Sequence, residues 1–580
     1  MTPFALHPRP RALSGFVNQV LGPGLVVLAS LAAAAPQILP LTALSTFGYD
    51  PLDAHLNLWN FWWTKQAIGG PQDPYWTSLL LYPAGASLAL HTYPMPYALI
   101  SVPIQYLLDG PAGLVAAFNV VVGCAFVMSA LGAYCLILRL TESRPAAIVC
   151  AVAFAWMPYR MLNVPRLSLV ATEFIVWYVL LWIRFVERPS RGRALAAGVV
   201  LALTLYTSAE YALYCVGFTL LWIGWFLVWQ RRAMPALPWR RVLVAPAVAV
   251  LLASPLLAVQ SRAFLNGEIR PARPIGEAVD WSPALVSFFT PSRLHPVYGS
   301  ALAFAGEYGD GRTIGMRTET TIGLTIWGLV MVALTRLKPD RTAFWAFAAA
   351  AFLILALGPV LRITGTWTTG IPLPYAVLHA VFPPLRASRD PTRLFPVAML
   401  MLTVLAGFGV RACLARISRA GVAMALTAVL IILVIFESAM VRAGKIEADA
   451  LIDPAYRQIA ATPGNFTVID LSLDQEALSA QTLHGHAITA GSVSIPRASA
   501  AGQMTGVERD FRDAERVLAL DGAAWAARLD VDRQELDRLH IRFVVVPEAA
   551  PAQRELARLL GLREHTRGRD RLLFELPAIR

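Results

Sequence analysis

The chain has 580 residues, of which 57% are hydrophobic and only 15% are charged. Apolar runs of about 20 residues recur along it, which is typical of a protein that crosses a membrane many times and excludes a single soluble domain. The formal net charge of +12 would suggest nucleic acid as the partner of a soluble protein, but no aromatic-plus-basic nucleic-acid-binding motif occurs.

The first residues carry Arg9 and Arg11 and no acid, so the positive-inside rule places them in the cytoplasm. An uncleaved first span is expected at about 20–42. Residues 43–110 then form the first outer loop. The apolar piece YPMPYALISVPIQYLL inside this loop contains three prolines and is short for a span, so it is expected to be interfacial or re-entrant.

The stretch from Gly48 to Trp63, GYDPLDAHLNLWNFWW, predicts an amphipathic helix that starts at Pro51. One face carries Leu52, Leu56, Trp59 and Trp63, and the opposite face carries Asp53, Asn57, Asn60 and Thr64. Such a helix is expected to lie in the membrane interface, with its tryptophans at headgroup level. Asp50 and Asp53 would then be held at the membrane surface. The alternative is local, because Asp50 as N-cap and Asp53 in the first turn also make a good helix start.

Ten more spans are expected after this loop, with basic residues in every short inside connection. They are placed at about 113–138, 145–160, 168–186, 194–209, 211–229, 242–259, 320–335, 342–359, 393–410 and 420–440. Between these spans, long outer loops are expected at 260–319 and 360–392. The predicted fold is therefore an α-helical polytopic membrane domain of about eleven spans over residues 1–441.

Residues 442–580 are charged and lack spanning runs. Apolar β-rich pieces at 466–471, 541–547 and 571–576 alternate with helical stretches around 506–519, 533–540 and 552–560. This pattern predicts a small α/β domain on the extracytoplasmic side. The five cysteines lie in apolar segments at spacings that match no zinc or redox motif, and we interpret them as core residues.

Three arginines in the loop IPLPYAVLHAVFPPLRASRDPTRLFP, namely Arg386, Arg389 and Arg393, lie on the face that should be poor in them. Guanidinium groups at a membrane surface suit a lipid phosphate or diphosphate. The alternative is that Asp390 neutralises one of them and the others pair or snorkel.

Other candidate residues lie at outer turns. Glu210 interrupts apolar sequence in TSAEYALY, and it is either functional or an ion-pair partner of Arg160 or Arg166. Tyr159, Arg160 and Arg166, in MPYRMLNVPRLSL, could orient a lipid phosphate or an acidic substrate. His91 could act as a base or hydrogen-bond donor, although a lone histidine at a loop end is more often structural. His484 and His486 lack the additional ligands of a zinc site.

The order of these features resembles the GT-C superfamily of polytopic glycosyltransferases, which includes oligosaccharyltransferases, protein O-mannosyltransferases and lipid A aminoarabinose transferases. The stretches GYDPLDAHLNLWNFWW, LLLYPAGASL, AFAWMPYRMLNVPRLSLV, LPYAVLHAVFPPLRASRDPTRLF and LHGHAITAGSVSIPR are similar to a family of bacterial membrane proteins of the YfhO type. The chain departs from many of these relatives at the Pro-Tyr-Arg turn, where they carry a histidine and it reads Asn163-Val-Pro-Arg166.

The resemblance implies an inverting transfer of a sugar from a polyprenyl-phosphate donor to an extracytoplasmic glycan, lipid or protein. It implies Asp50 or Asp53 as base or as ligand of a divalent metal, Glu210 as a second acid, and the three loop arginines near the donor phosphate. We expect a bacterial inner-membrane enzyme that has the lipid bilayer, the donor and the acceptor as partners. The alternatives are a transporter or flippase of a lipid-linked envelope intermediate, and a non-catalytic envelope-assembly protein.

Overall fold

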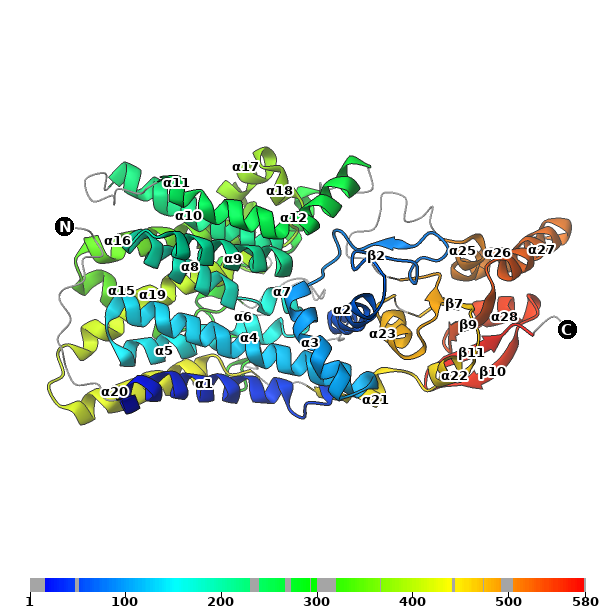
Figure 1. Ribbon diagram of the computed structural model, residues 1–580, viewed down its shortest axis with the longest axis horizontal. Coiled ribbons are helices and arrows are strands. Elements are labelled where there is room, and N and C mark those ends of the chain that lie inside the picture. The colour runs from blue at the N-terminus through cyan, green and yellow to red at the C-terminus, as the bar shows by residue number, and fades with distance from the viewer. Residues whose placement is uncertain are drawn as a thin grey trace. The chain divides into compact units, whose positions relative to one another are not determined.

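The structure is a computed structural model, shown as a ribbon in Figure 1, and most of the chain is described. The described residues are 16–46, 52–229, 239–266, 273–292, 294–299, 320–365, 367–440, 444–472, 474–491 and 504–577. The chain divides into two compact units. The helical unit comprises Met1–Ile38, Val122–Pro255 and Pro271–Ala443, and the mixed unit comprises Leu39–Val121, Leu256–Arg270 and Gly444–Arg580.

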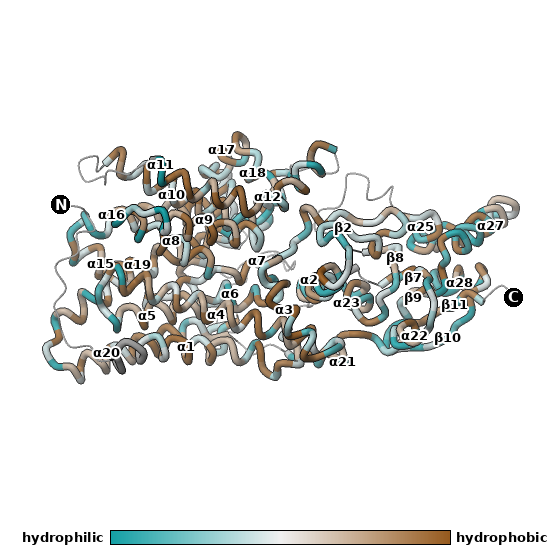
Figure 2. Tube along the Cα trace, in the orientation of Figure 1, coloured by the Kyte–Doolittle hydropathy of each residue, from teal (hydrophilic) through white to brown (hydrophobic). Residues whose placement is uncertain are grey.

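Long apolar helices dominate the helical unit, and Figure 2 shows brown, hydrophobic residues along them. Its longer helices are α1 (Phe16–Ile38), α4 (Gly110–Thr141), α5 (Arg144–Ala155), α8 (Glu173–Glu187), α9 (Arg191–Thr207), α10 (Ala209–Trp229), α12 (Val244–Leu265), α15 (Leu324–Arg336), α16 (Pro339–Ala356), α19 (Phe395–Leu414) and α20 (Ala420–Glu437). Helices α4 and α12 continue into the mixed unit. Each of the eleven segments predicted as spans therefore coincides with a helix.

Eight helices in the described part of the chain are long and apolar enough to cross a membrane. They are Gly110–Thr141, Arg144–Leu162, Leu167–Glu187, Ala209–Trp229, Arg240–Leu265, Pro339–Ala356, Pro391–Leu414 and Ala420–Glu437. The chain is thus a multi-pass membrane protein. Whether α1, α9 and α15 also cross stays a prediction, as does the side of the membrane on which each loop lies.

Helix α19 is the centre of the helical unit. Every residue from Phe395 to Val410 is buried, and the helix packs against α5, α15 and α16. A helix that is apolar on all sides is expected to be enclosed by other helices. Gly409 allows the closest approach, because a Cβ there would lie 2.0 Å from the carbonyl oxygen of Leu329 in α15.

Short elements connect these helices: α6 (Pro158–Leu162), α7 (Leu167–Val170), α11 (Trp239–Val242), α13 (Ile275–Asp280), η2 (Leu285–Phe288), α17 (Pro374–Val381), α18 (Pro383–Arg386) and η4 (Pro391–Leu394). A hairpin of β4 (Val360–Arg362) and β5 (Thr368–Pro372) precedes α17. Most candidate residues of this unit lie on these connections.

A five-stranded sheet in the order β10-β11-β9-β7-β8 forms the core of the mixed unit. Its strands are β7 (Thr467–Asp470), β8 (Ala487–Ile488), β9 (Ile541–Pro547), β10 (Arg563–Arg567) and β11 (Arg571–Glu575). Strands β7, β8 and β9 are parallel, and β10 and β11 add antiparallel pairs. The three strands predicted from the sequence are present.

Helices accompany this sheet: α21 (Ala448–Leu451), α22 (Ala455–Ala461), α23 (Asp474–His484), α25 (Gly506–Arg512), α26 (Ala514–Leu518), α27 (Gly522–Arg538) and α28 (Pro551–Leu559). The C-terminal part also takes up sequence from the first predicted loop. Strand β1 (Ala43–Thr46) pairs antiparallel with β6 (Gly444–Glu447), and the loop adds α2 (Leu52–Gly69), the short pair β2 (Trp76–Thr77) and β3 (Ala86–Ser87), and α3 (Met95–Leu107). The predicted domain boundary at 441 stays a prediction; in the structure Gly444–Arg580 forms one compact unit together with Leu39–Val121 and Leu256–Arg270.

The prediction that the tryptophans of α2 lie among lipid headgroups is wrong. Trp59 and Trp63 are buried, and so are Asn57, Asn60 and Thr64 on the opposite face. The helix packs against α23 and α3, and the Nε1 of Trp59 donates a 2.7 Å hydrogen bond to Gln481 of α23. Side-chain amides and hydroxyls inside a protein need such partners, and here the mixed unit supplies them.

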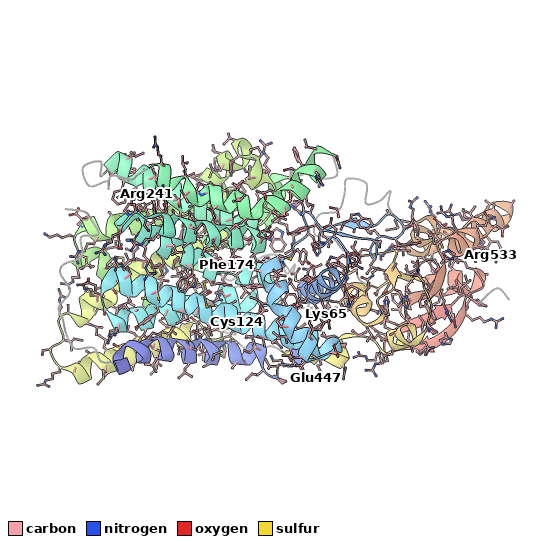
Figure 3. All side chains as sticks on the ribbon, in the orientation of Figure 1. Lys65, Cys124, Phe174, Arg241, Glu447 and Arg533 are labelled. Carbon is pink, nitrogen blue, oxygen red and sulfur yellow. The ribbon has the colours of Figure 1, made fainter. Side chains whose placement is uncertain are left out.

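Lys65, labelled in Figure 3, connects the C-terminal part of α2 to α3. Its Nζ donates to the carbonyl oxygen of Gln105 in α3 at 2.9 Å and lies 4.6 Å from the centroid of the Tyr106 ring. With 13 residues, α3 is shorter than any span-length helix, as expected for a piece that does not cross the bilayer.

Candidate functional site

The Pro-Tyr-Arg turn lies where the chain leaves α5 and passes through α6 and α7 to α8. Arg160 is fully buried there. Its Nη1 donates to the carbonyl oxygen of Ala155 at 3.1 Å, its Nη2 to that of Val170 at 3.3 Å, and its guanidinium lies 4.1 Å from the centroid of the Phe126 ring. Interrupted helices leave carbonyl groups without partners, and a guanidinium has five donors to satisfy them. These contacts favour a structural role for Arg160, and its role as a substrate contact stays a prediction.

Tyr159 is buried beside it, with its ring centroid 5.8 Å from that of Phe395. Its predicted contact with substrate has no support in this arrangement, because its side chain is enclosed by the helical unit. The hydroxyl lies within electrostatic range of Arg393 and Glu210. We interpret Tyr159 as part of the packing around that ion pair.

Glu210 and Arg393 form an ion pair, in which Nη1 of Arg393 donates to Oε2 of Glu210. Asp390 is the second acid at this arginine, with its Oδ2 3.6 Å from Nε of Arg393. Asp390 also caps η4, since its Oδ1 accepts a 3.0 Å hydrogen bond from the backbone N–H of Thr392. Glu210 is thus an ion-pair partner, as one alternative predicted, but its partner is Arg393 rather than Arg160 or Arg166.

Arg386 caps the C-terminal end of α17. Its Nε donates to the carbonyl oxygen of His379 at 2.9 Å, and its Nη2 donates to that of Ala380. A positive side chain is favourable at this end of a helix, where the carbonyl groups carry partial negative charge. Two of the three predicted phosphate-binding arginines, Arg386 and Arg393, therefore have protein partners.

Arg389 is the third, and its guanidinium carbon lies 4.8 Å from the centroid of the Trp281 ring. Arg166 approaches the same indole at 6.0 Å, and its Nη1 also donates to Oδ1 of Asn163 at 3.2 Å. Burial lowers the pKa of Arg389, and the charges of Arg393, Arg273 and Arg166 lower it further. Burial is the largest of these causes, and the Asp390 carboxylate acts in the opposite direction; the neighbouring arginines are positive charges that a bound anion would offset.

Neighbouring contacts hold Trp281 in place. Trp281 directly follows α13, and its backbone N–H donates to the carbonyl oxygen of Glu277 at 3.1 Å. Arg362 of β4 donates to the carbonyl oxygens of Ser282 and Val279, both at 3.3 Å. The backbone N–H of Arg273 donates to the carbonyl oxygen of Arg386 at 2.9 Å. This hydrogen bond joins the segment to residues 386–393, which carry the three loop arginines and which we call the arginine loop. We call Arg166, Arg389 and Trp281 the arginine–tryptophan site.

Sequence reasoning missed Trp281 and Arg273, which lie in the predicted loop 260–319. No motif marks them. The local sequence, AVDWSP, has one large aromatic residue between Asp280 and Ser282.

Asp53 and His91 of the first loop lie in the mixed unit. Asp50 lies outside the described residues. Asp53 is partly buried in the first turn of α2, where its carbonyl oxygen accepts a 2.8 Å hydrogen bond from Nδ2 of Asn57. Asp53 and the arginine–tryptophan site thus belong to different units, and the predicted common pocket stays a prediction.

His91 is buried, and its Nε2 lies 3.0 Å from Oδ1 of Asn60. Asn60 uses its Nδ2 to donate to the carbonyl oxygen of Thr92, so its Oδ1 accepts and Nε2 of His91 carries the proton. Burial lowers the pKa of His91 to about 4, so the ring is neutral at pH 7. This arrangement favours the structural alternative over a role as base.

Among the described residues, no group of three or more His, Cys, Asp or Glu side chains could hold a metal ion. The divalent metal that the resemblance allowed at Asp50 or Asp53 stays a prediction, since Asp50 is not described.

No protein-family model and no curated protein sequence matches the chain. Solved structures do match it over nearly its whole length. The oligosaccharyltransferase AglB from Archaeoglobus fulgidus, solved with an inhibitory peptide and a dolichol-phosphate, aligns with a TM-score of 0.50 and 11% identity over 92% of this chain and 70% of its own. ArnT from Cupriavidus metallidurans, in the apo state, aligns with a TM-score of 0.51 and 14% identity over 96% and 97% of the two chains.

The arabinofuranosyltransferase AftD from Mycobacteria aligns with a TM-score of 0.58 and 16% identity over 98% of this chain, which spans 42% of the length of AftD. At these identities the likeness concerns the fold. All three are members of the superfamily that the sequence resembles, and the chain has the GT-C fold.

Proposed function

We propose that this chain is a membrane glycosyltransferase that transfers a sugar from a lipid-phosphate donor to an acceptor on the extracytoplasmic side. The observation that carries the proposal is the GT-C fold over more than nine-tenths of the chain, shared with three transferases of this kind. One of these was solved with a dolichol-phosphate, which supports a lipid phosphate as the donor class.

The reaction that we propose is an inverting displacement. A carboxylate takes the proton of the acceptor hydroxyl, the acceptor oxygen forms a bond to the anomeric carbon, and the bond from that carbon to the phosphate oxygen breaks. The electron pair stays on the departing lipid phosphate. The step needs a base near the acceptor and positive charge near the leaving group.

We assign the base to Asp50 or Asp53, as the resemblance implies. For the phosphate we favour Arg389 and Arg166 over the full loop cluster, because Arg386 caps α17 and Arg393 is paired with two acids. Glu210 is then a positioning residue: its ion pair with Arg393 holds the segment that carries Arg389.

The test is sugar transfer by the purified chain in nanodiscs with a panel of labelled polyprenyl-phosphate sugars. With the donor that supports transfer, we expect Asp50→Asn or Asp53→Asn to lower the rate by about 100- to 10,000-fold, the contribution of a general base. Asp109→Asn is the matched control, because Asp109 belongs to the same loop and its side chain is 90% exposed.

Full activity in both the Asp50→Asn and the Asp53→Asn chain would remove the base assignment. If no donor in the panel supports transfer, while the labelled lipid is moved between leaflets of a reconstituted vesicle, the chain is a flippase and the proposal is wrong.

A further inference from the structure

The connection between α16 and α19 lies between two helices that are long and apolar enough to cross a membrane. The span-length helices on either side are Pro339–Ala356 and Pro391–Leu414, so residues 357–390 lie between two membrane crossings. This connection contains the hairpin β4–β5, helix α17 and the short helix α18. None of these is long enough to cross a bilayer.

One side of the connection is bound to the helical unit. The carbonyl oxygen of Ile363, next to β4, accepts a 3.2 Å hydrogen bond from the backbone N–H of Val286. In α17 the side chains of Tyr375 and His379 are buried, one helical turn apart on the same face. The helix packs against α16, so this face is covered by protein.

The other side is apolar and exposed. In the hairpin, Trp367 is 61% exposed and Ile371 is 54% exposed. On the outer face of α17, Val377 is 63% and Val381 is 70% exposed. Leu378 and Phe382 add 39% and 38% exposure beside them. We call these six side chains the apolar ridge.

We propose that the apolar ridge is inserted into the lipid leaflet, so that α17 and the tip of the β4–β5 hairpin form a membrane-embedded edge beside the arginine loop. A helix that is apolar on both faces is not stable in water, and its second face requires an apolar partner. Lipid is the apolar partner that we propose, because the helices before and after this connection are long and apolar enough to cross a membrane.

The residue types agree with this occupant. Trp367 is an aromatic residue of the kind expected at a membrane–water boundary, and Arg386, which caps the end of α17 from α18, can keep its charge at headgroup level. Arg386 also binds the last carbonyl groups of α17. The apolar ridge is therefore tied through Arg386 to the loop that carries Arg389, independently of what reaction the chain catalyses.

A spin label reports which solvent covers the apolar ridge. The full-length chain, with Cys124, Cys135 and Cys413 replaced by alanine to remove the cysteines that are not buried, is labelled at Val381→Cys and reconstituted in nanodiscs of phosphatidylcholine and phosphatidylglycerol. Collision with molecular oxygen, which enters lipid, is compared with collision with a water-soluble nickel chelate. The matched control is Val531→Cys, a helical valine of α27 that is 51% exposed.

We expect the oxygen-to-nickel accessibility ratio at position 381 to exceed that at position 531 by several fold, and Val377→Cys to agree with position 381. Equal ratios at 381 and 531 would show water at the ridge and overturn the proposal. A label at both 377 and 381 that neither collision partner reaches would show that protein covers the ridge, which also overturns it.

Discussion

At the scale of single residues, the loop arginines show how one residue type takes three roles within eight positions. Arg386 caps a helix, Arg393 is held by Glu210 and Asp390, and only Arg389 points its charge at an aromatic face. When a guanidinium lies over the face of an indole, its N–H groups point outward in the guanidinium plane, where they can donate to an anion. The phosphate site that we propose therefore depends on Trp281 as much as on the arginines.

Trp281→Leu removes the aromatic face under Arg389 and Arg166. A cation–π contact contributes about 0.5–2 kcal/mol, so we expect the affinity for a short polyprenyl phosphate to fall by about 2- to 30-fold at constant salt. Trp281→Phe should restore most of it, because a ring remains. If Arg389→Ala weakens binding and Trp281→Leu does not, the indole has no positioning role; if neither weakens it, the phosphate binds elsewhere.

The ion pair of Glu210 and Arg393 makes a second prediction at this scale. Both side chains are mostly buried, with exposed fractions of 21% and 25%. Glu210→Gln leaves Arg393 with one acid instead of two, and we expect a loss of about 1–3 kcal/mol of unfolding free energy, between the values for exposed and buried pairs. In a double-mutant cycle, Glu210→Gln with Arg393→Gln should cost less than the sum of the single changes. Additive costs would mean that the pair does not form.

At the scale of elements, α2 illustrates how a partner changes the meaning of a sequence pattern. Its tryptophans and amides alternate around the helix in a way that suits a membrane interface, yet α23 and α3 enclose both faces. His55 contributes to the same packing, with its Nδ1 2.5 Å from Oγ of Ser479. The helix is part of a core.

Trp59→Ala should therefore cost about 3–5 kcal/mol of unfolding free energy, the usual loss for a large buried aromatic side chain. Trp76→Ala is the control, since Trp76 belongs to the same first loop but is 44% exposed. The measurement is hydrogen exchange of peptides from α2 and α23 in the full chain. Equal protection in the two variants would contradict the burial of α2.

At the scale of the whole molecule, acid acts on the mixed unit through three buried histidines and one buried aspartate. Burial lowers the pKa of His55 and His91 to about 4, and burial with the charge of His486 lowers that of His484 to about 3. Burial and the Asp510 carboxylate raise the pKa of Asp532 to about 7. The four groups act in opposite directions.

The unfolded chain protonates its histidines near pH 6.5, so the three buried rings cause a loss of stability as the pH falls from about 6.5 to about 4. Asp532 keeps its proton in the folded state, so its contribution is lost as the pH rises from about 4 to about 7. Burial also lowers the pKa of His486 and raises that of Asp470, so four histidines act against two aspartates, which predicts a net loss of stability in acid.

Asp532→Asn removes the opposing contribution. We expect this variant to be more stable than the parent chain above pH 7 and to lose stability more steeply toward pH 4.5. Hydrogen exchange of β7 and β9 peptides in the full chain, corrected for the intrinsic pH dependence of exchange, measures both effects. A variant with the parental pH profile would show that Asp532 is ionised in the folded chain.

Much of the architecture followed from the sequence alone, because the signals are local. Helix length and apolar content depend on residues within one segment, and so the eleven predicted segments are helices and the three C-terminal strands are present. The positions of the arginine loop and the Pro-Tyr-Arg turn on connections between helices were equally readable. The resemblance to the GT-C superfamily agreed with the fold for the same reason.

Only the tertiary structure decided which charges are already paired and which surfaces are covered. Arg393 meets Glu210 across 183 positions of sequence, and Trp59 meets Gln481 across 422. Trp281 receives two arginines from segments that no motif connects to it. The hydropathy of a segment and the spacing of its apolar residues show whether it suits an apolar or an aqueous environment. The role of a buried charge or amide depends instead on the particular group that packing places next to it.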